Sequence, residues 1–145
     1  MKLGFVSDSL GGMSFTDMLD HAQRVGVSGV EVNTCGWSTA PHFDLKGLLG
    51  NKTAQAAFQK EFSDRNLEII SLNANGNPLH PTDPTHGQGL RDTICVAGEM
   101  GIKTVVVPSD SSDYHRVTGD CHRPAKLRIV FGVGGLEVGL LAPSL

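Results

Sequence analysis

Short, almost entirely apolar segments recur along this chain, and each of the first three is followed by residues with a helical pattern. The segments are LGFVS (3–7), GVEVNT (29–34), LEIISLN (67–73) and KTVVVPS (103–109). Strands that alternate with helices form parallel βαβ units, and strands that are apolar throughout are covered on both faces of their sheet. The sequence therefore predicts an α/β fold whose first four strands run parallel and in chain order.

Helices are predicted between these strands. Ser14 stands where an N-cap is expected, Asp17 follows three residues later, and Gly26 ends the first helix. Apolar residues at helical spacing place a second helix at about 52–65 and a third at about 90–100.

The last part of the chain has a different pattern. The segments LRIVFGV and LEVGLL flank Gly134 and Gly135, as in a β-hairpin with a two-residue turn. A β-hairpin is therefore predicted in the tail.

Composition argues against several classes of protein. No apolar run reaches the roughly 18 residues of a transmembrane helix, and the apolar stretch at the N-terminus is too short for a signal peptide. The formal net charge is −3, with no basic stripe for nucleic-acid phosphates. The three cysteines have no CxxC spacing, so reduced thiols and a cytoplasmic location are expected.

Polar loops rich in proline and glycine follow the strands. The longest, NANGNPLHPTDPTHG (73–87), contains two histidines. In parallel α/β folds, ligands bind beyond the carboxyl ends of the strands, where these loops converge. The sequence therefore predicts a ligand site at this edge of the sheet.

Three stretches resemble the xylose isomerase-like TIM-barrel superfamily, and the nearest branch is the sugar phosphate isomerases and epimerases. They are GVSGVEVNTCGWSTAPHFDL, LNANGNPLHP and LRDTICVAGEMGIKTVVVPS. The resemblance covers residues 1 to about 109. It implies a partial (β/α)8 barrel, with four β/α units in residues 1–110 and a divergent tail in 111–145. A truncated gene, a frameshift or a fragment would each explain the tail.

The resemblance also implies a chemistry. Members of the superfamily hold a divalent metal (Mn, Mg, Co or Zn) that binds two oxygens of a sugar or sugar phosphate. The metal assists a proton or hydride shift between adjacent carbons. Its usual ligands (Glu, Asp, His, Glu) come from strands five to eight, beyond the resemblance. The chain is therefore expected to be incomplete and inactive as it stands, with its catalytic residues unassigned.

Two candidate substrate-binding residues belong to the second unit. Glu31 interrupts an apolar strand, and the resemblance favours a pocket-facing carboxylate over an ion pair inside the sheet. Trp37, the one tryptophan, is expected either to form an apolar wall for a sugar or to cover the helix layer.

The other candidates are loop residues. His42 and His80 are expected to share a pocket, the alternative being structural roles in their own loops. Asn77 is expected either to bind a sugar hydroxyl or to shape its turn. His80 is the one candidate metal ligand, because apurinic endonucleases of the same superfamily use a histidine after the third strand. His86 is expected to face solvent.

Two other functions remain open. A DNA-repair endonuclease of the superfamily would need a basic rim, which the acidic body of this chain does not provide. A non-catalytic half-barrel partner module would self-associate, as a homodimer through exposed barrel edges.

Overall fold

The computed structural model describes residues 3–107, 128–133 and 136–140. Along the chain, the elements are β1 (Gly4–Val6), the 3-10 helix η1 (Ser7–Leu10), α1 (Phe15–Val25), β2 (Gly29–Gly36), α2 (Leu45–Leu48), α3 (Lys52–Ser63), β3 (Glu68–Asn75), α4 (Thr85–Met100), β4 (Thr104–Val107), β5 (Arg128–Val133) and β6 (Leu136–Leu140).

The strands form one sheet in the order β1-β2-β3-β4-β5-β6. The four parallel strands predicted in chain order are confirmed: β1 pairs with β2, β2 with β3 and β3 with β4, all parallel. β5 continues the sheet parallel to β4, and β6 pairs with β5 antiparallel. The two strands of the predicted hairpin are therefore present, while its turn, residues 134–135, lies outside the described residues.

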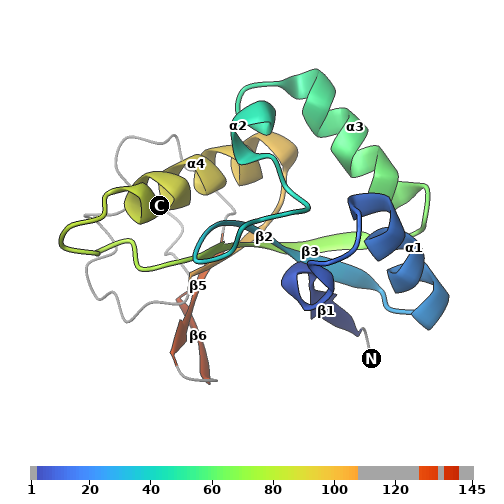
Figure 1. The fold of residues 1–145 in the computed structure, drawn as a ribbon, viewed down its shortest axis with the longest axis horizontal. Coiled ribbons are helices and arrows are strands. Elements are labelled where there is room, and N and C mark those ends of the chain that lie inside the picture. Colours follow the sequence, from blue (N-terminus) through green and yellow to red (C-terminus); the bar gives the residue numbers. More distant parts are fainter. Residues whose placement is uncertain (1–2, 108–127, 134–135, 141–145) are drawn as a thin grey trace.

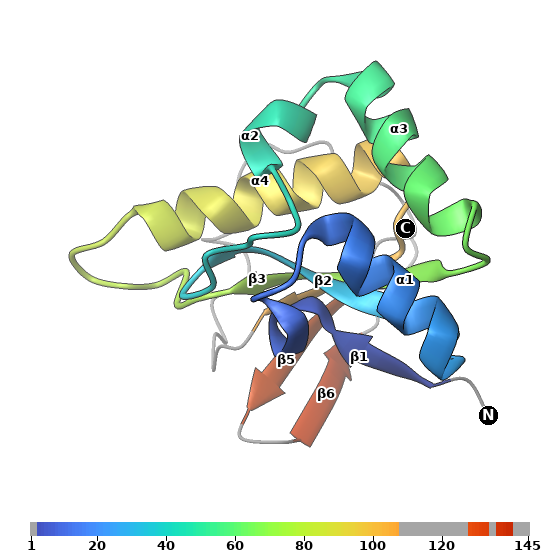
Figure 2. The same cartoon turned by 45° about the vertical axis from the view of Figure 1, so that its right-hand side comes forward.

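The helices α1, α3 and α4 gather on one face of the sheet in both views (Figure 1, Figure 2). The hydrophobic core lies between this helix layer and the sheet. It is built largely from aliphatic strand residues and from apolar residues at helical spacing. Residues with less than 2% exposure include Val30, Val32, Leu72, Val105 and Val107 from the strands and Met18, Leu19, Ile94 and Val96 from the helices. Burying each of the larger side chains stabilises the fold by about 1.5–3 kcal/mol.

The first helix begins and ends as predicted. The Ser14 hydroxyl accepts a hydrogen bond from the backbone N–H of Asp17 (3.1 Å) and donates one to the Asp17 carboxylate (2.7 Å). Gly26 ends the helix in the left-handed region (φ 75°), which glycine adopts without strain.

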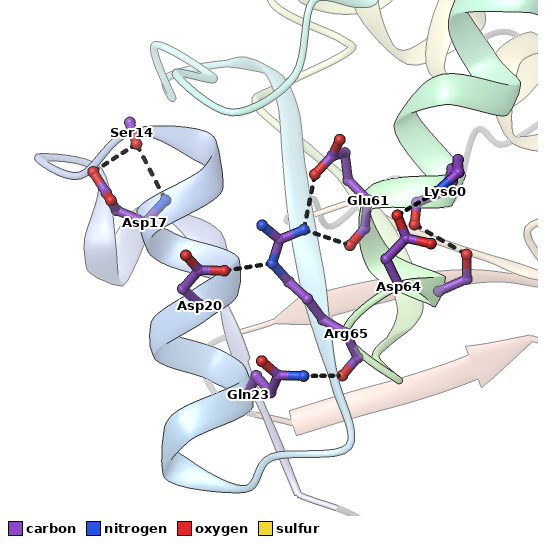
Figure 3. Close-up of polar contacts among 9 residues, drawn as sticks. Ser14, Asp17, Asp20, Gln23, Lys60, Glu61, Asp64 and Arg65 are labelled. Carbon is purple, nitrogen blue, oxygen red and sulfur yellow. Dashed lines mark hydrogen bonds and ion pairs between the residues drawn. The ribbon is translucent and has the colours of Figure 1, made fainter.

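A polar bridge joins α1 to the end of α3 (Figure 3). The Arg65 guanidinium donates to Asp20 on α1 (2.6 Å) and to Glu61 on α3 (2.8 Å). The hydrogen bonds to Asp20 and then Glu61 raise the pKa of Arg65 above its ordinary value. Gln23 adds a bond from its amide to the Arg65 carbonyl (3.3 Å). The bridge fixes the spacing of the two helices.

The structure also tests the expectations about membrane-spanning helices and about the cysteines. In the part of the chain that the structure describes, no helix is long and apolar enough to cross a membrane. Cys35 has a free thiol, but Cys95 is disulfide-bonded, so the prediction of reduced thiols is wrong for Cys95. Cys121 lies outside the described residues.

Candidate functional site

The loops that follow β2 and β3 lie side by side at the carboxyl edge of the sheet. The backbone N–H of Trp37 donates to the Asn75 carbonyl. Gly36 has a φ of 86°, and a Cβ at this position would lie 1.9 Å from the Asn75 oxygen. Only glycine allows so close an approach of the two backbones. The sequence Gly36-Trp37 therefore determines how the two loops meet.

Aromatic and imidazole rings gather where these loops meet, in what we call the rim cluster: Trp37, Asn77, His80 and His86. The Trp37 and His86 rings lie edge to face with centroids 5.7 Å apart, and His80 lies 6.0 Å from His86. The backbone N–H of Asn77 donates to His86 Nδ1 (2.9 Å). Three predicted site residues thus come together around a histidine that was expected to face solvent.

His86 is the site residue that sequence reasoning missed. Its side chain is 10% exposed, so the expectation that it faces solvent is wrong. His86 lies in the first turn of α4, nine residues beyond Asn77, and the Pro-rich loop between them folds back to bring the two into contact. Local spacing contains no sign of that return.

The loop from Asn77 to Thr85 is held by its own polar groups. His80 Nδ1 accepts from the backbone N–H of Asp83 (2.9 Å), and Asn77 Oδ1 accepts from that of Leu79 (3.0 Å). The hydroxyl and then the backbone N–H of Thr85 bond the Asp83 carboxylate, and these bonds lower its pKa below the ordinary value. Because His80 and His86 both accept at Nδ1, each neutral ring has its proton on Nε2.

A groove of about 370 Å³ borders the rim cluster. It is lined by Pro78, Leu79, His80, Pro81, Pro84, Gly87 and Arg91. Trp37, joined to His80 through His86, is 64% exposed. The groove and the exposed indole offer apolar surface and N–H donors to a small polar ligand. Two larger hollows, of about 570 and 690 Å³, lie near the amino end of β3, away from these groups.

A second group of polar side chains lies within the sheet itself. Glu31 accepts from the Ser71 hydroxyl (2.6 Å) and from Asn73 Nδ2 (2.7 Å). Ile69 pairs with Val30 but Ser71 pairs with Glu31, so Ile70 is the extra residue of a β-bulge. The bulge puts Ser71 and Asn73 on the same side of the sheet as Glu31. The few polar residues of these two strands are therefore gathered on one face of the sheet.

Asn33 completes this group, which we call the strand cluster: Glu31, Asn33, Ser71 and Asn73. Asn33 lies two residues after Glu31, on the same face, and pairs in register with Asn73. The oxygens Asn33 Oδ1 and Asn73 Oδ1 are both buried without a hydrogen-bond partner. The cluster therefore holds two unmet acceptors, and each such buried acceptor costs about 1–3 kcal/mol.

The two clusters are separate places. Glu31 lies within β2, whereas Trp37 follows the end of this strand at Gly36, and at about 3.3 Å per residue their backbones are at most about 20 Å apart. Glu31 and Trp37 as substrate-binding residues therefore both stay predictions.

The hydrogen-bond partner of His42 lies outside the rim cluster. It is 4% exposed, and its Nε2 lies 3.0 Å from the carbonyl of Met13, in the loop before α1. His42 Nδ1 is buried without a partner. The contact with Met13 agrees with the alternative expectation for His42, a structural role.

The described residues do not fit the metal that the resemblance implies. Among residues 3–107, no group of three or more His, Cys, Asp or Glu side chains is placed to hold an ion. His80 Nδ1 already accepts a backbone hydrogen bond, which leaves Nε2 for any ion. His80 as a metal ligand therefore stays a prediction.

Comparisons with known proteins place the chain among uncharacterised relatives. No family model matches it. It is 39% identical over 111 residues to the uncharacterized protein YfiH of Bacillus subtilis (strain 168), covering 75% of this chain and 36% of that protein. A crystal structure of an uncharacterized protein from Parabacteroides distasonis ATCC 8503 superposes with a TM-score of 0.66 at 14% identity, covering 91% of this chain and 52% of that one. The chain is thus a homologue of YfiH that spans about a third of its length, and the crystal structure supports the fold alone.

Proposed function

We propose that the carboxyl rim of this sheet binds a sugar or sugar phosphate, as part of an isomerase or epimerase of the xylose isomerase-like kind. The observation that carries the proposal is the rim cluster beside its groove. Trp37 is 64% exposed beside His86, which in turn lies beside His80, and the groove lies where parallel α/β folds bind ligands.

Each group at the rim has a role in this proposal. The exposed indole of Trp37 packs against the carbon face of a sugar ring, as apolar walls of concave sites do. His80 donates from Nε2 to a ligand oxygen, because its Nδ1 is occupied by the backbone N–H of Asp83. Neither role needs the Glu31 carboxylate.

The proposal extends to the barrel and to its catalysis. Four parallel strands in chain order, with helices on one face, are compatible with half of a (β/α)8 barrel. The chain spans 36% of YfiH, so the remaining units and their metal ligands would belong to a longer protein. We derive no step through a metal, because the described residues do not fit one.

Binding can be read from the protein's own fluorescence. Trp37 is the one tryptophan of the chain and stands at the proposed site. We expect ketohexoses or their phosphates to change its emission, and His80→Ala to weaken binding at least tenfold. His21→Ala is the matched control, because His21 is a helix residue that contacts Arg24, outside the rim cluster. Equal binding by the two variants, or no response to any sugar, would contradict the proposal.

The open edge of the sheet favours a second candidate, a non-catalytic partner module. Among the strands that the structure describes, β1 is an edge strand that pairs with β2 alone, and Leu3 beside it is 57% exposed. Free strand edges pair readily with another chain. Sedimentation of the purified chain over a range of concentrations tests this candidate: a dimer without sugar binding would favour it over the first.

A further inference from the structure

The strand cluster combines an uncompensated carboxylate with two unmet acceptors. Glu31 accepts from two neutral donors, Ser71 and Asn73, and neither neutralises its charge. Among the described residues, no lysine or arginine pairs with Glu31. A half-buried carboxylate without a cation is costly, since burial disfavours its charge.

The hydrogen bonds fix which way the Asn73 amide points. Its Nδ2 end donates to Glu31 Oε1 at 2.7 Å, so its Oδ1 end is left over and stays unpaired. Asn33 pairs in register with Asn73 from the neighbouring strand, and its side-chain oxygen Oδ1 is also without a hydrogen-bond partner. Glu31 therefore acts as a positioning residue: it orients the Asn73 side chain so that the amide oxygen Oδ1 can serve as an acceptor.

We infer that the strand cluster is a binding site for a primary ammonium group. Such a group carries a positive charge and three N–H donors with no acceptor. It would meet Asn33 Oδ1, Asn73 Oδ1 and a remaining lone pair of the Glu31 carboxylate. A hydroxyl group or a water molecule supplies fewer donors and leaves the carboxylate charge unbalanced. The observations that support this site are independent of the proposed sugar site.

Methylammonium is the probe, and tetramethylammonium is its control, because the second ion carries the same charge without an N–H donor. We expect methylammonium at one hundred times its Kd to lower the unfolding constant of the full chain about 100-fold in urea denaturation. Tetramethylammonium at the same ionic strength is expected to leave it unchanged. Equal effects of the two ions, or no effect of methylammonium, would overturn the inference.

Asn33→Leu is the decisive variant. Its side chain has a similar size, and no other described residue bonds the Asn33 side chain, whose oxygen is unpaired. We expect the variant without amine to unfold at a higher urea concentration, because an unmet buried acceptor is gone. It should also lose the methylammonium response. A lower unfolding midpoint would show that the carbonyl is paired in solution, and that result would overturn the inference.

Glu31→Gln and Ser71→Ala complete the series. Glu31→Gln removes the charge and should abolish the methylammonium response, whereas Glu61→Gln, the same change on the α3 surface, should keep it. Ser71→Ala loses a donor to Glu31 and should unfold at a lower urea concentration, the opposite of Asn33→Leu. Retention of the response in Glu31→Gln would overturn the inference.

The same experiment identifies the source of the ammonium group. A small amine should leave the sedimenting mass of the chain at that of the monomer. A dimer that dissociates on addition of methylammonium, and that Asn33→Leu does not form, would assign the group to a lysine of a second copy. Either result supports an ammonium site.

Discussion

Cys35 shows how burial can silence a reactive residue at the carboxyl edge of the sheet. Burial raises the pKa of its thiol, although hydrogen bonds with Thr34 and Thr93 oppose this effect. A raised pKa lowers the thiolate fraction at any pH below it, and the thiolate is the nucleophile. We therefore predict that iodoacetamide at pH 8 alkylates Cys35 far more slowly in the folded chain than in urea. Peptide mass mapping measures this rate for Cys35 separately, and equal rates in both states would contradict the prediction.

At the residue scale, the sequence identified three of the four residues that gather at the rim, but it missed His86 and the bonds that hold the cluster together. Trp37, Asn77 and His80 were predicted from their place after strands, and they do come together. Glu31 could not be assigned to the sheet face, because the bulge at Ile70 that sets its partners has no local signature. His42 could not be separated from His80, because its partner, the Met13 carbonyl, is a backbone atom distant in sequence.

At the scale of elements, α4 packs on β2 through a glycine. A Cβ on Gly89 would lie 2.7 Å from Cys35 Sγ and 3.0 Å from its Cβ. Alanine favours helix by about 1 kcal/mol over glycine, whereas overpacking costs about 1–3 kcal/mol. We predict that Gly89→Ala lowers the free energy of unfolding, measured in urea. The loss should shrink in a Cys35→Ala background, and Gly12→Ala, where a Cβ meets open space, is the control. A gain in stability for Gly89→Ala would contradict the predicted clash.

The bridge between α1 and α3 permits a matched comparison of two ion pairs. Arg65 is 15% exposed and joins both helices, whereas Lys60 pairs with Asp64 one turn away on the surface, where the two are 69% and 51% exposed. Exposed pairs within a helix contribute about 0.3–0.5 kcal/mol. We predict that Arg65→Met lowers the free energy of unfolding by about 1 kcal/mol and by more than Lys60→Met does. Equal losses in urea denaturation would show that the bridge adds nothing to the packing of the helices.

The order and direction of the elements were predictable, but several boundaries and polar contacts were not. Apolar runs located the first four strands, which are parallel. Hydrophobic periodicity located the buried face of α4, where Leu90, Ile94 and Ala97 are at most 2% exposed. The short elements η1 and α2 were missed, because four residues are too few to show a period. Gln55 is only 2% exposed although it is polar, because its amide bonds the Leu48 carbonyl and Glu99, and the sequence pattern does not reveal these bonds.

At the scale of the whole molecule, the sheet formed by the described residues is open between its two edge strands, β1 and β6. A closed (β/α)8 barrel has eight parallel strands in about 250 residues, whereas the described part of this 145-residue chain has five strands in parallel pairs. Among the described residues, the rim cluster comes from the segments that follow β2 and β3. A ligand held there would be bound on one side.

We predict that the 145-residue chain does not isomerise ketohexoses or their phosphates faster than the metal ion alone. The proposed chemistry needs an ion held by several ligands and a proton carrier in register, and an error of about 1 Å can cost about 100-fold. Residues 3–107 provide no group of three metal-ligating side chains. An ion held by His80 alone would stay largely hydrated. The assay uses the purified chain with Mn, Mg, Co or Zn and a panel of sugars. Turnover above the metal blank, lost in His80→Ala but kept in His21→Ala, would contradict the prediction, because it would require further ligands from outside these residues.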